Sequence, residues 1–103
     1  MVEKAVLATV HFASLHREIP PADAAAELEA LSRSAGLSVV KSLVWRQQAP
    51  QAPLLVGAGK AQELRDEVEK YGADVVLIES DLSPSQQRNL EDRVQVKTID
   101  RTQ

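Results

Sequence analysis

Segments with the composition of strands alternate with segments of helical periodicity along this chain, and this alternation is what most constrains its fold. The run ADVVLIE at 73–79 is apolar between its acidic residues, which is typical of a parallel strand buried on both faces. Strand-like runs also occupy 4–12, 37–45 and 96–99, with a very short one at 54–56, and helical patterns occupy 23–35, 60–71 and 84–93. This order predicts an α/β fold, with a small, mainly parallel sheet of about four strands and helices on its faces.

The length and composition predict one domain over residues 1–103 with an aliphatic core. Apolar residues make up 44% of the 103 residues but aromatic residues only 3%, so Val, Leu, Ile and Ala must fill the interior. Cysteine is absent, which excludes disulfides and cysteine-based zinc sites. No apolar run reaches the roughly 18–20 residues that span a bilayer, and no signal peptide is evident, so we expect a cytoplasmic protein without a membrane span.

The net charge of −3 argues against binding nucleic acid through overall charge. Contact with RNA would therefore need a local basic patch. We expect such a patch only if Arg46, Lys60, Arg88 and Arg93 lie on one surface. If these side chains point to different faces, docking on RNA is disfavoured.

Local signals set the ends and the buried faces of the expected helices. In the first helix Ala24, Leu28, Leu31 and Ala35 recur at helical spacing and are expected to face the core, and Gly36 is placed to end the helix in a left-handed conformation. The third helix has the clearest start: Ser83 as N-cap, Pro84 at the first helical position and Gln86 placed to complete a capping box.

The stretch Gly57-Ala58-Gly59-Lys60 allows two interpretations. Backbone N–H groups in a glycine turn before a helix can bind an anion, and Lys60 would add a positive charge. The Walker pattern fails, however, because Ala61 follows the lysine and Leu54 stands where the first glycine belongs. The dinucleotide-binding pattern fails as well, since Gln62 replaces its third glycine. A sharp turn from strand to helix is therefore favoured over a phosphate site.

Three other groups of polar residues are candidates for binding. Glu79 and Asp81 follow the central strand, where two carboxylates could hold Mg²⁺, although a turn with a solvated carboxylate explains them more simply. The loop after the second strand carries Arg46, Gln47 and Gln48, and the third helix begins with Gln86, Gln87, Arg88 and Asn89. Trp45 is expected to be a core or edge aromatic. No residues form a recognisable catalytic centre or metal site.

Several segments together resemble the N-terminal domain of the HflX family of ribosome-associated GTPases. They are LSRSAGLSVV, VGAGKAQEL, ADVVLIESDLSPSQQRNLE and VKTIDRT, which occur in the family's order and spacing from about residue 26 onward. The run LSPSQQRNL at 82–90 is the most specific. The resemblance implies an α/β domain that is followed by a helical linker and a G domain, in a protein that binds the large ribosomal subunit and dissociates stalled or idle ribosomes.

The resemblance also limits what this chain can do by itself. It has no Walker lysine with serine or threonine, no D-x-x-G and no N-K-x-D, so GTP and Mg²⁺ would bind in a G domain that is absent here. We expect a fragment of a longer GTP-binding protein that docks on the ribosome and its RNA. ATP binding by this domain, or a structural role in orienting the G domain, are the alternatives. The expected contact residues for RNA or nucleotide phosphate are Gly57, Gly59, Lys60, Arg46, Gln87 and Arg88.

Overall fold

The chain forms one four-stranded parallel sheet with helices on both faces. The computed structural model describes residues 2–12, 21–48, 54–80 and 82–100. The elements are β1 (Lys4–Phe12), α1 (Pro21–Ser34), β2 (Ser38–Gln47), α2 (Ala58–Tyr71), β3 (Val75–Glu79), α3 (Pro84–Val94) and β4 (Lys97–Asp100). The strand order is β2-β1-β3-β4, and all three neighbouring pairs are parallel. The predicted fold class is confirmed.

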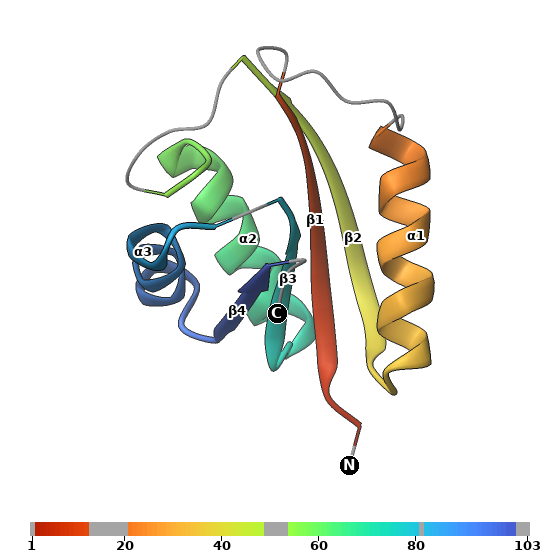
Figure 1. Cartoon of the computed structure of the whole chain (residues 1–103). Coiled ribbons are helices and arrows are strands. Elements are labelled where there is room, and N and C mark those ends of the chain that lie inside the picture. Colours follow the sequence, from red (N-terminus) through yellow and green to blue (C-terminus); the bar gives the residue numbers. More distant parts are fainter. Residues whose placement is uncertain (1, 13–20, 49–53, 81, 101–103) are drawn as a thin grey trace.

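The helices divide into two layers, with α1 on one face of the sheet and α2 and α3 on the other (Figure 1). Successive side chains of a strand point to opposite faces, so each strand supplies two separate apolar clusters. The cluster that we call the α1 core contains Ala5, Leu7, Leu28 and Val75. The larger α2–α3 core includes Val6, Val10, Trp45, Leu64, Ile78 and Leu90. The aliphatic interior expected from the composition is therefore present on both sides.

A β-bulge in β2 shifts the alternation of its side chains by one residue. Ala5 pairs with Val39 whereas the next residue, Val6, pairs with Lys41, so Val40 is the extra residue. As a result Val39 packs against the α1 core, whereas Trp45, which lies an even number of residues further on, packs in the α2–α3 core.

The start of α3 forms as its sequence predicts. The backbone N–H of Gln86 donates to Ser83 Oγ at 3.1 Å, and the N–H of Ser83 donates to Gln86 Oε1 at 3.0 Å. This capping box, with Pro84 at the first helical position, satisfies two N–H groups that the helix cannot pair internally. Gly36 also has the expected positive φ, at +87°.

Side chains of α3 close the outer edge of β4. The Gln87 side-chain amide donates to the Thr98 carbonyl oxygen at 2.9 Å, and the Thr98 N–H donates to Glu91 Oε1 at 3.2 Å. Because the N–H and C=O of one strand residue point to the same side, both groups of Thr98 face away from β3. We call this pair of contacts the edge seal. It occupies backbone groups that would otherwise be open to pairing with another strand.

The structure corrects several boundaries expected from the sequence. The short strand at 54–56 is absent, since only Leu55 makes an isolated β-bridge, with a positive φ of 69°. β2 runs two residues past Trp45, so Arg46 lies on the strand and not in the following loop. Gly59 and Lys60 lie inside the first turn of α2, whose N-cap is Gly57, and the turn therefore ends earlier than expected.

The predicted buried face of α1 is only half right. Leu28 is buried, but Leu31 is 64% exposed and Ala35 is also exposed. The reason is that α1 lies mainly over β1 and β2, so the side of the helix that faces β3 and β4 has little to pack against (Figure 1). Ser32 is buried instead of Leu31, and the Ser32 hydroxyl donates to the Leu28 carbonyl oxygen at 2.8 Å.

Candidate functional site

Lys60, the most suggestive cation of the sequence, is held by neighbouring side chains at the start of α2. Its Nζ lies 5.4 Å from the ring centroid of Trp45 and 3.7 Å from Glu63 Oε2. Trp45 Nε1 also donates to Glu63 Oε1, at 3.4 Å. The three side chains form a cluster in which the carboxylate offsets the charge of the ammonium group. The Lys60 side chain remains 41% exposed, so it still reaches solvent.

The glycine turn before α2 is clamped by a glutamine of β2. Gly57 N–H donates to Gln47 Oε1 at 3.2 Å, and Gln47 Nε2 donates to the Leu55 carbonyl oxygen at 3.4 Å. The N–H groups of Lys60 and Ala61 both donate to the Gly57 carbonyl oxygen. A phosphate-wrapping loop needs several free N–H groups that converge on one point. Since two of the four N–H groups of residues 57–60 are already paired, the geometry favours a fixed helix start.

Arg46 lies on the opposite face of the sheet from Lys60. Its neighbours on β2 both face α2: Trp45 lies in the α2–α3 core, and Gln47 reaches Leu55 and Gly57. Strand alternation therefore directs Arg46 toward the α1 side. Arg46 is exposed, and within the described residues no ion pair involves it.

The two predicted contact residues of α3 differ in their surroundings. Gln87 is half-buried and forms part of the edge seal, because its amide donates to Thr98 and approaches Glu91 Oε1 at 3.5 Å. Arg88, the next residue, is exposed and has no ion-pair partner in the part of the chain that the structure describes. Arg88 is therefore available to an outside partner, whereas Gln87 is engaged in holding β4.

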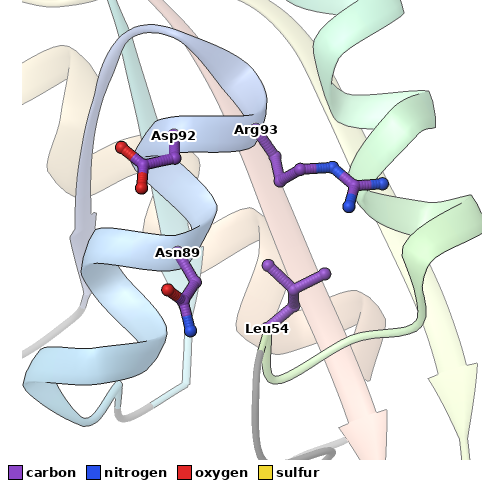
Figure 2. Close-up of a pocket in the computed structure, with 4 residues that line it drawn as sticks. All are labelled: Leu54, Asn89, Asp92 and Arg93. Carbon is purple, nitrogen blue, oxygen red and sulfur yellow. The ribbon is translucent and has the colours of Figure 1, made fainter.

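Arg93, at the end of α3, extends beside a shallow apolar pocket. The pocket has a volume of about 290 Å³ and is lined by Leu54, Asn89, Asp92 and Arg93 (Figure 2). Leu54 projects from the segment before α2, and the other three residues come from the last two turns of α3. Arg93 is exposed and belongs to the same α2–α3 layer as Arg88 and Lys60.

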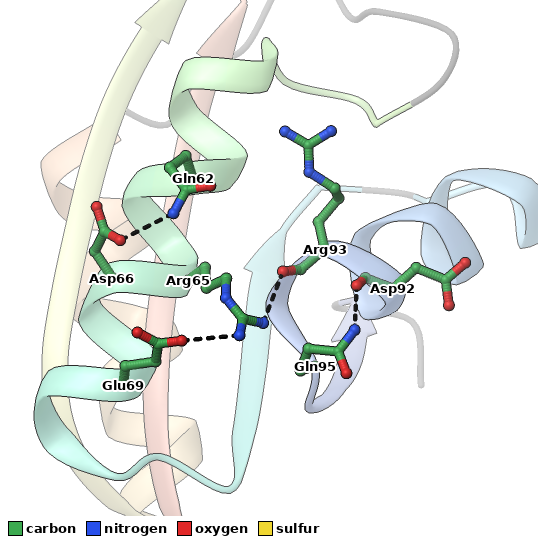
Figure 3. Close-up of polar contacts among 7 residues, drawn as sticks. All are labelled: Gln62, Arg65, Asp66, Glu69, Asp92, Arg93 and Gln95. Atoms are coloured by element: carbon green, nitrogen blue, oxygen red, sulfur yellow. Dashed lines mark hydrogen bonds and ion pairs between the residues drawn. The ribbon is translucent and has the colours of Figure 1, made fainter.

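Polar contacts join α2 to the carboxyl end of α3 (Figure 3). Arg65 is central: its guanidinium donates to the Arg93 carbonyl oxygen at 3.3 Å and pairs with Glu69 at 2.9 Å. Gln95 ends α3 in a left-handed conformation, with φ of 65°, and its side chain donates to the Asp92 carbonyl oxygen. These contacts fix the relative positions of α2 and α3 and of the cations that they carry.

The four cations considered for a basic patch are thus divided between two faces. Lys60, Arg88 and Arg93 belong to the α2–α3 layer, and Arg46 lies on the other side of the sheet. The patch is therefore incomplete, and Glu63 and Asp92 reduce its net charge.

The proposed pair of magnesium ligands is not tested by the structure. Glu79 is half-buried at the end of β3, but Asp81 lies outside the described residues. Within those residues, no group of three or more His, Asp or Glu side chains is arranged to hold a metal ion.

Sequence reasoning missed three residues that shape this region, Arg65, Glu91 and Thr98, and it took Gln47 for a binding residue of a loop and not for a clamp on the glycine turn. Their partners are distant in the chain, so no local pattern identifies them. Glu63 is different, since its spacing of three residues from Lys60 on a helix would have indicated the ion pair.

Comparison with known proteins decides the family. The profile of the family described as "GTP-binding GTPase N-terminal" matches residues 22–103. The chain belongs to this family. The sequence is 42% identical over 76 residues to GTPase HflX of Escherichia coli, a match that covers 74% of this chain and 18% of that protein. It is 33% identical over 78 residues to GTPase HflX of Chlamydia pneumoniae, covering 75% of this chain and 16% of the relative. The predicted resemblance to the HflX N-terminal domain is confirmed.

Solved structures support the same fold. Two crystal structures of SsGBP point variants superpose with TM-scores of 0.66 and 0.65, at 18% and 17% sequence identity. The first match covers 96% of this chain but only 28% of that protein. The present chain therefore spans less than a third of the proteins that it matches in sequence or structure. Among the described residues, no helix combines the length and apolar character needed to cross a membrane.

Proposed function

We propose that this chain is the N-terminal docking and regulatory domain, over residues 1–103, of an HflX-like cytoplasmic GTP-binding protein that binds the large ribosomal subunit. The family match over residues 22–103 is the observation that carries the proposal. In this proposal GTP and Mg²⁺ bind in a separate G domain, because the present sequence lacks the GTPase motifs. The domain contributes binding surface and orientation, and the whole protein dissociates or rescues ribosomes.

The α2–α3 layer is the side that we assign to ribosomal RNA. Arg88 and Arg93 are exposed there, Lys60 is half-buried with its side chain 41% exposed, and the Arg65 contacts hold the two helices together. Because the whole chain is acidic, attraction to phosphate must come from such a local arrangement. Arg88 supports this assignment best, since no acidic side chain among the described residues neutralises it.

A pelleting assay with isolated large ribosomal subunits tests this proposal. Arg88→Glu and Arg93→Glu should each weaken binding, and each lost phosphate contact should lower the slope of log affinity against log salt by about 0.7–0.9. Arg33→Glu is the matched control, because Arg33 is an exposed arginine on α1, in the opposite layer. Binding that is equally strong for all three variants would refute the assignment of this face.

ATP binding at the start of α2 is the second candidate function. One observation favours it: Gly57 supplies no side-chain cap, so the first N–H groups of α2 are not all satisfied within the helix. Lys60 would be the cationic partner of a phosphate, provided that it leaves Glu63. Equilibrium dialysis with labelled ATP tests this function. Binding should fall in Lys60→Ala, and equal binding by the wild type and the variant would rule out this site.

A further inference from the structure

The order of the strands singles out one edge of the sheet. The chain passes from β1 through α1 to β2 on one side of β1, and then from β2 through α2 to β3 on the other side of β1. α1 and α2 lie on opposite faces of the sheet (Figure 1). In an open parallel sheet the connections diverge where the strand order reverses, and ligands bind there, at the carboxyl ends of the strands. In this chain that point lies between the carboxyl ends of β1 and β3.

Two buried polar atoms at this end of β1 lack a partner. They are Thr9 Oγ1 and His11 Nδ1, and within the described residues neither makes a hydrogen bond. Thr9 is fully buried and His11 is half-buried. Strand alternation places both side chains on the α1 face, because Ala5 and Leu7 of the same strand pack in the α1 core. Buried polar atoms are normally hydrogen-bonded, and a bound ligand supplies the missing partner.

Charged side chains from the neighbouring strands flank these two residues. Arg46 of β2 lies opposite His11, and Glu79 of β3 lies opposite Thr9. Arg46 faces the α1 side, and Glu79 does so as well, since it lies two residues after Leu77, which packs against the α1 core. Neighbouring strands are only about 4.8 Å apart, so the four side chains share one small area of the sheet. We call Thr9, His11, Arg46 and Glu79 the carboxyl-edge cluster.

The donors of the carboxyl-edge cluster suit a phosphate group. Arg46 is exposed and makes no ion pair in the part of the chain that the structure describes, and a guanidinium group binds two phosphate oxygens at once. The hydroxyl of Thr9 and a protonated ring nitrogen of His11 are further donors. α1 also begins at this end of the sheet, so the positive end of its dipole favours an anion here (Figure 1). Glu79 opposes the anion and limits its affinity.

We propose that the carboxyl-edge cluster binds a phosphate group. Arg46 and His11 contact the phosphate oxygens, and the Thr9 hydroxyl beneath them gains the hydrogen-bond partner that it lacks in this structure. The phosphate belongs to a small phosphorylated molecule or to the backbone of an RNA, which present the same oxygens. The site is separate from the surface assigned to ribosomal RNA above, because that surface lies in the α2–α3 layer, on the opposite face of the sheet. Either proposal can therefore fail without the other.

Titration of the 103-residue chain with inorganic phosphate, followed through the backbone amide NMR signals, tests this proposal. We expect saturable shifts centred on His11 and Arg46. Arg46→Gln should weaken binding about tenfold, because it removes charge-assisted hydrogen bonds. Arg33→Gln is the matched control and should bind like the wild type, since Arg33 is an exposed arginine of α1 that pairs with Glu29. Glu79→Gln should tighten binding, because it removes a negative charge beside the phosphate.

Thr9→Val distinguishes a binding site from a structural defect in the core. The substitution replaces an unpartnered hydroxyl by a methyl group of similar size, so without phosphate the variant should be at least as stable as the wild type in urea denaturation. With phosphate it should gain less stability than the wild type, because its ligand binds more weakly. Three results would overturn the proposal: no saturable shift at the carboxyl-edge cluster, equal affinity of the wild type and Arg46→Gln, or equal stabilisation of Thr9→Val and the wild type by phosphate.

A parallel titration with a short oligouridylate identifies the source of the phosphate. If the ligand is an RNA backbone, the oligonucleotide should bind more tightly than inorganic phosphate and lose affinity as the salt concentration rises. If the ligand is a small phosphorylated molecule, the oligonucleotide should bind no better than inorganic phosphate. Both results support a phosphate site, whereas shifts by the oligonucleotide that are confined to α2 and α3 would count against it.

Discussion

Replacing Gln87 with leucine is the most direct test of the edge seal. Leucine is similar in size and is also a good helix former, so the substitution removes the amide and little else. Thr98 is fully buried, and its carbonyl oxygen would lose the hydrogen bond of 2.9 Å from Gln87. A buried carbonyl without a partner costs about 1–3 kcal/mol. For a domain of this size, 1 kcal/mol corresponds to about 4–8 °C in melting temperature.

The expected result for Gln87→Leu is therefore a loss of about 1–2 kcal/mol in the free energy of unfolding, measured by urea denaturation with circular dichroism. Arg88→Leu is the control, because Arg88 is the next residue on α3 and is exposed, and its effect should stay within about 0.5 kcal/mol. Glu91→Leu completes a double-mutant cycle, since both side chains bind Thr98. Equal stability of Gln87→Leu and Arg88→Leu would show that Gln87 does not hold β4.

Three further predictions concern other contacts. Ser83→Ala removes the N-cap of α3 and should cost about 1 kcal/mol in urea denaturation, and Ser83→Asp should restore most of it; no loss in the alanine variant would contradict the role of the capping box. Lys60→Met removes the ammonium group beside Trp45, the one tryptophan of the chain, so its fluorescence spectrum should change; an unchanged spectrum would argue against the cluster. Gln47→Leu should speed hydrogen exchange at the Gly57 amide about tenfold, and unchanged exchange would mean that the clamp does not protect it.

Much of the fold could be predicted because its signals are local. The run at 73–79 is apolar enough to specify a central parallel strand, and the structure places β3 between β1 and β4. Ser83, Pro84 and Gln86 determine a helix start through contacts within one turn. Gly36 ends α1 with a positive φ, as a residue without Cβ allows. Each of these features depends on residues that are adjacent in the sequence.

The site was harder to predict because its contacts join distant elements. Gln87 follows the pattern of a polar helix surface, and its role becomes visible only when β4 lies beside it. Gln47 appeared to belong to a loop, yet it clamps a turn that lies 8–10 residues further along the chain. Arg46 and Lys60 lie on opposite faces of the sheet, and this placement depends on the pairing of β2 with β1. The burial of Leu31 was predicted wrongly because helical periodicity identifies an apolar stripe but not the element that covers it.

The bulge at Val40 has a consequence for how β2 tolerates change. Val40 and Lys41 together lie opposite Val6. Two residues of β2 therefore occupy one position in the alternation of side chains between the two faces of the sheet. A deletion of Val40 would leave Trp45 and Gln47 on their present face, because it only removes the surplus residue. An insertion of one residue between Lys41 and Trp45 would act like a frameshift and turn both side chains toward α1. In the evolution of this domain, loss of the bulge residue and a one-residue insertion after it therefore carry very different penalties.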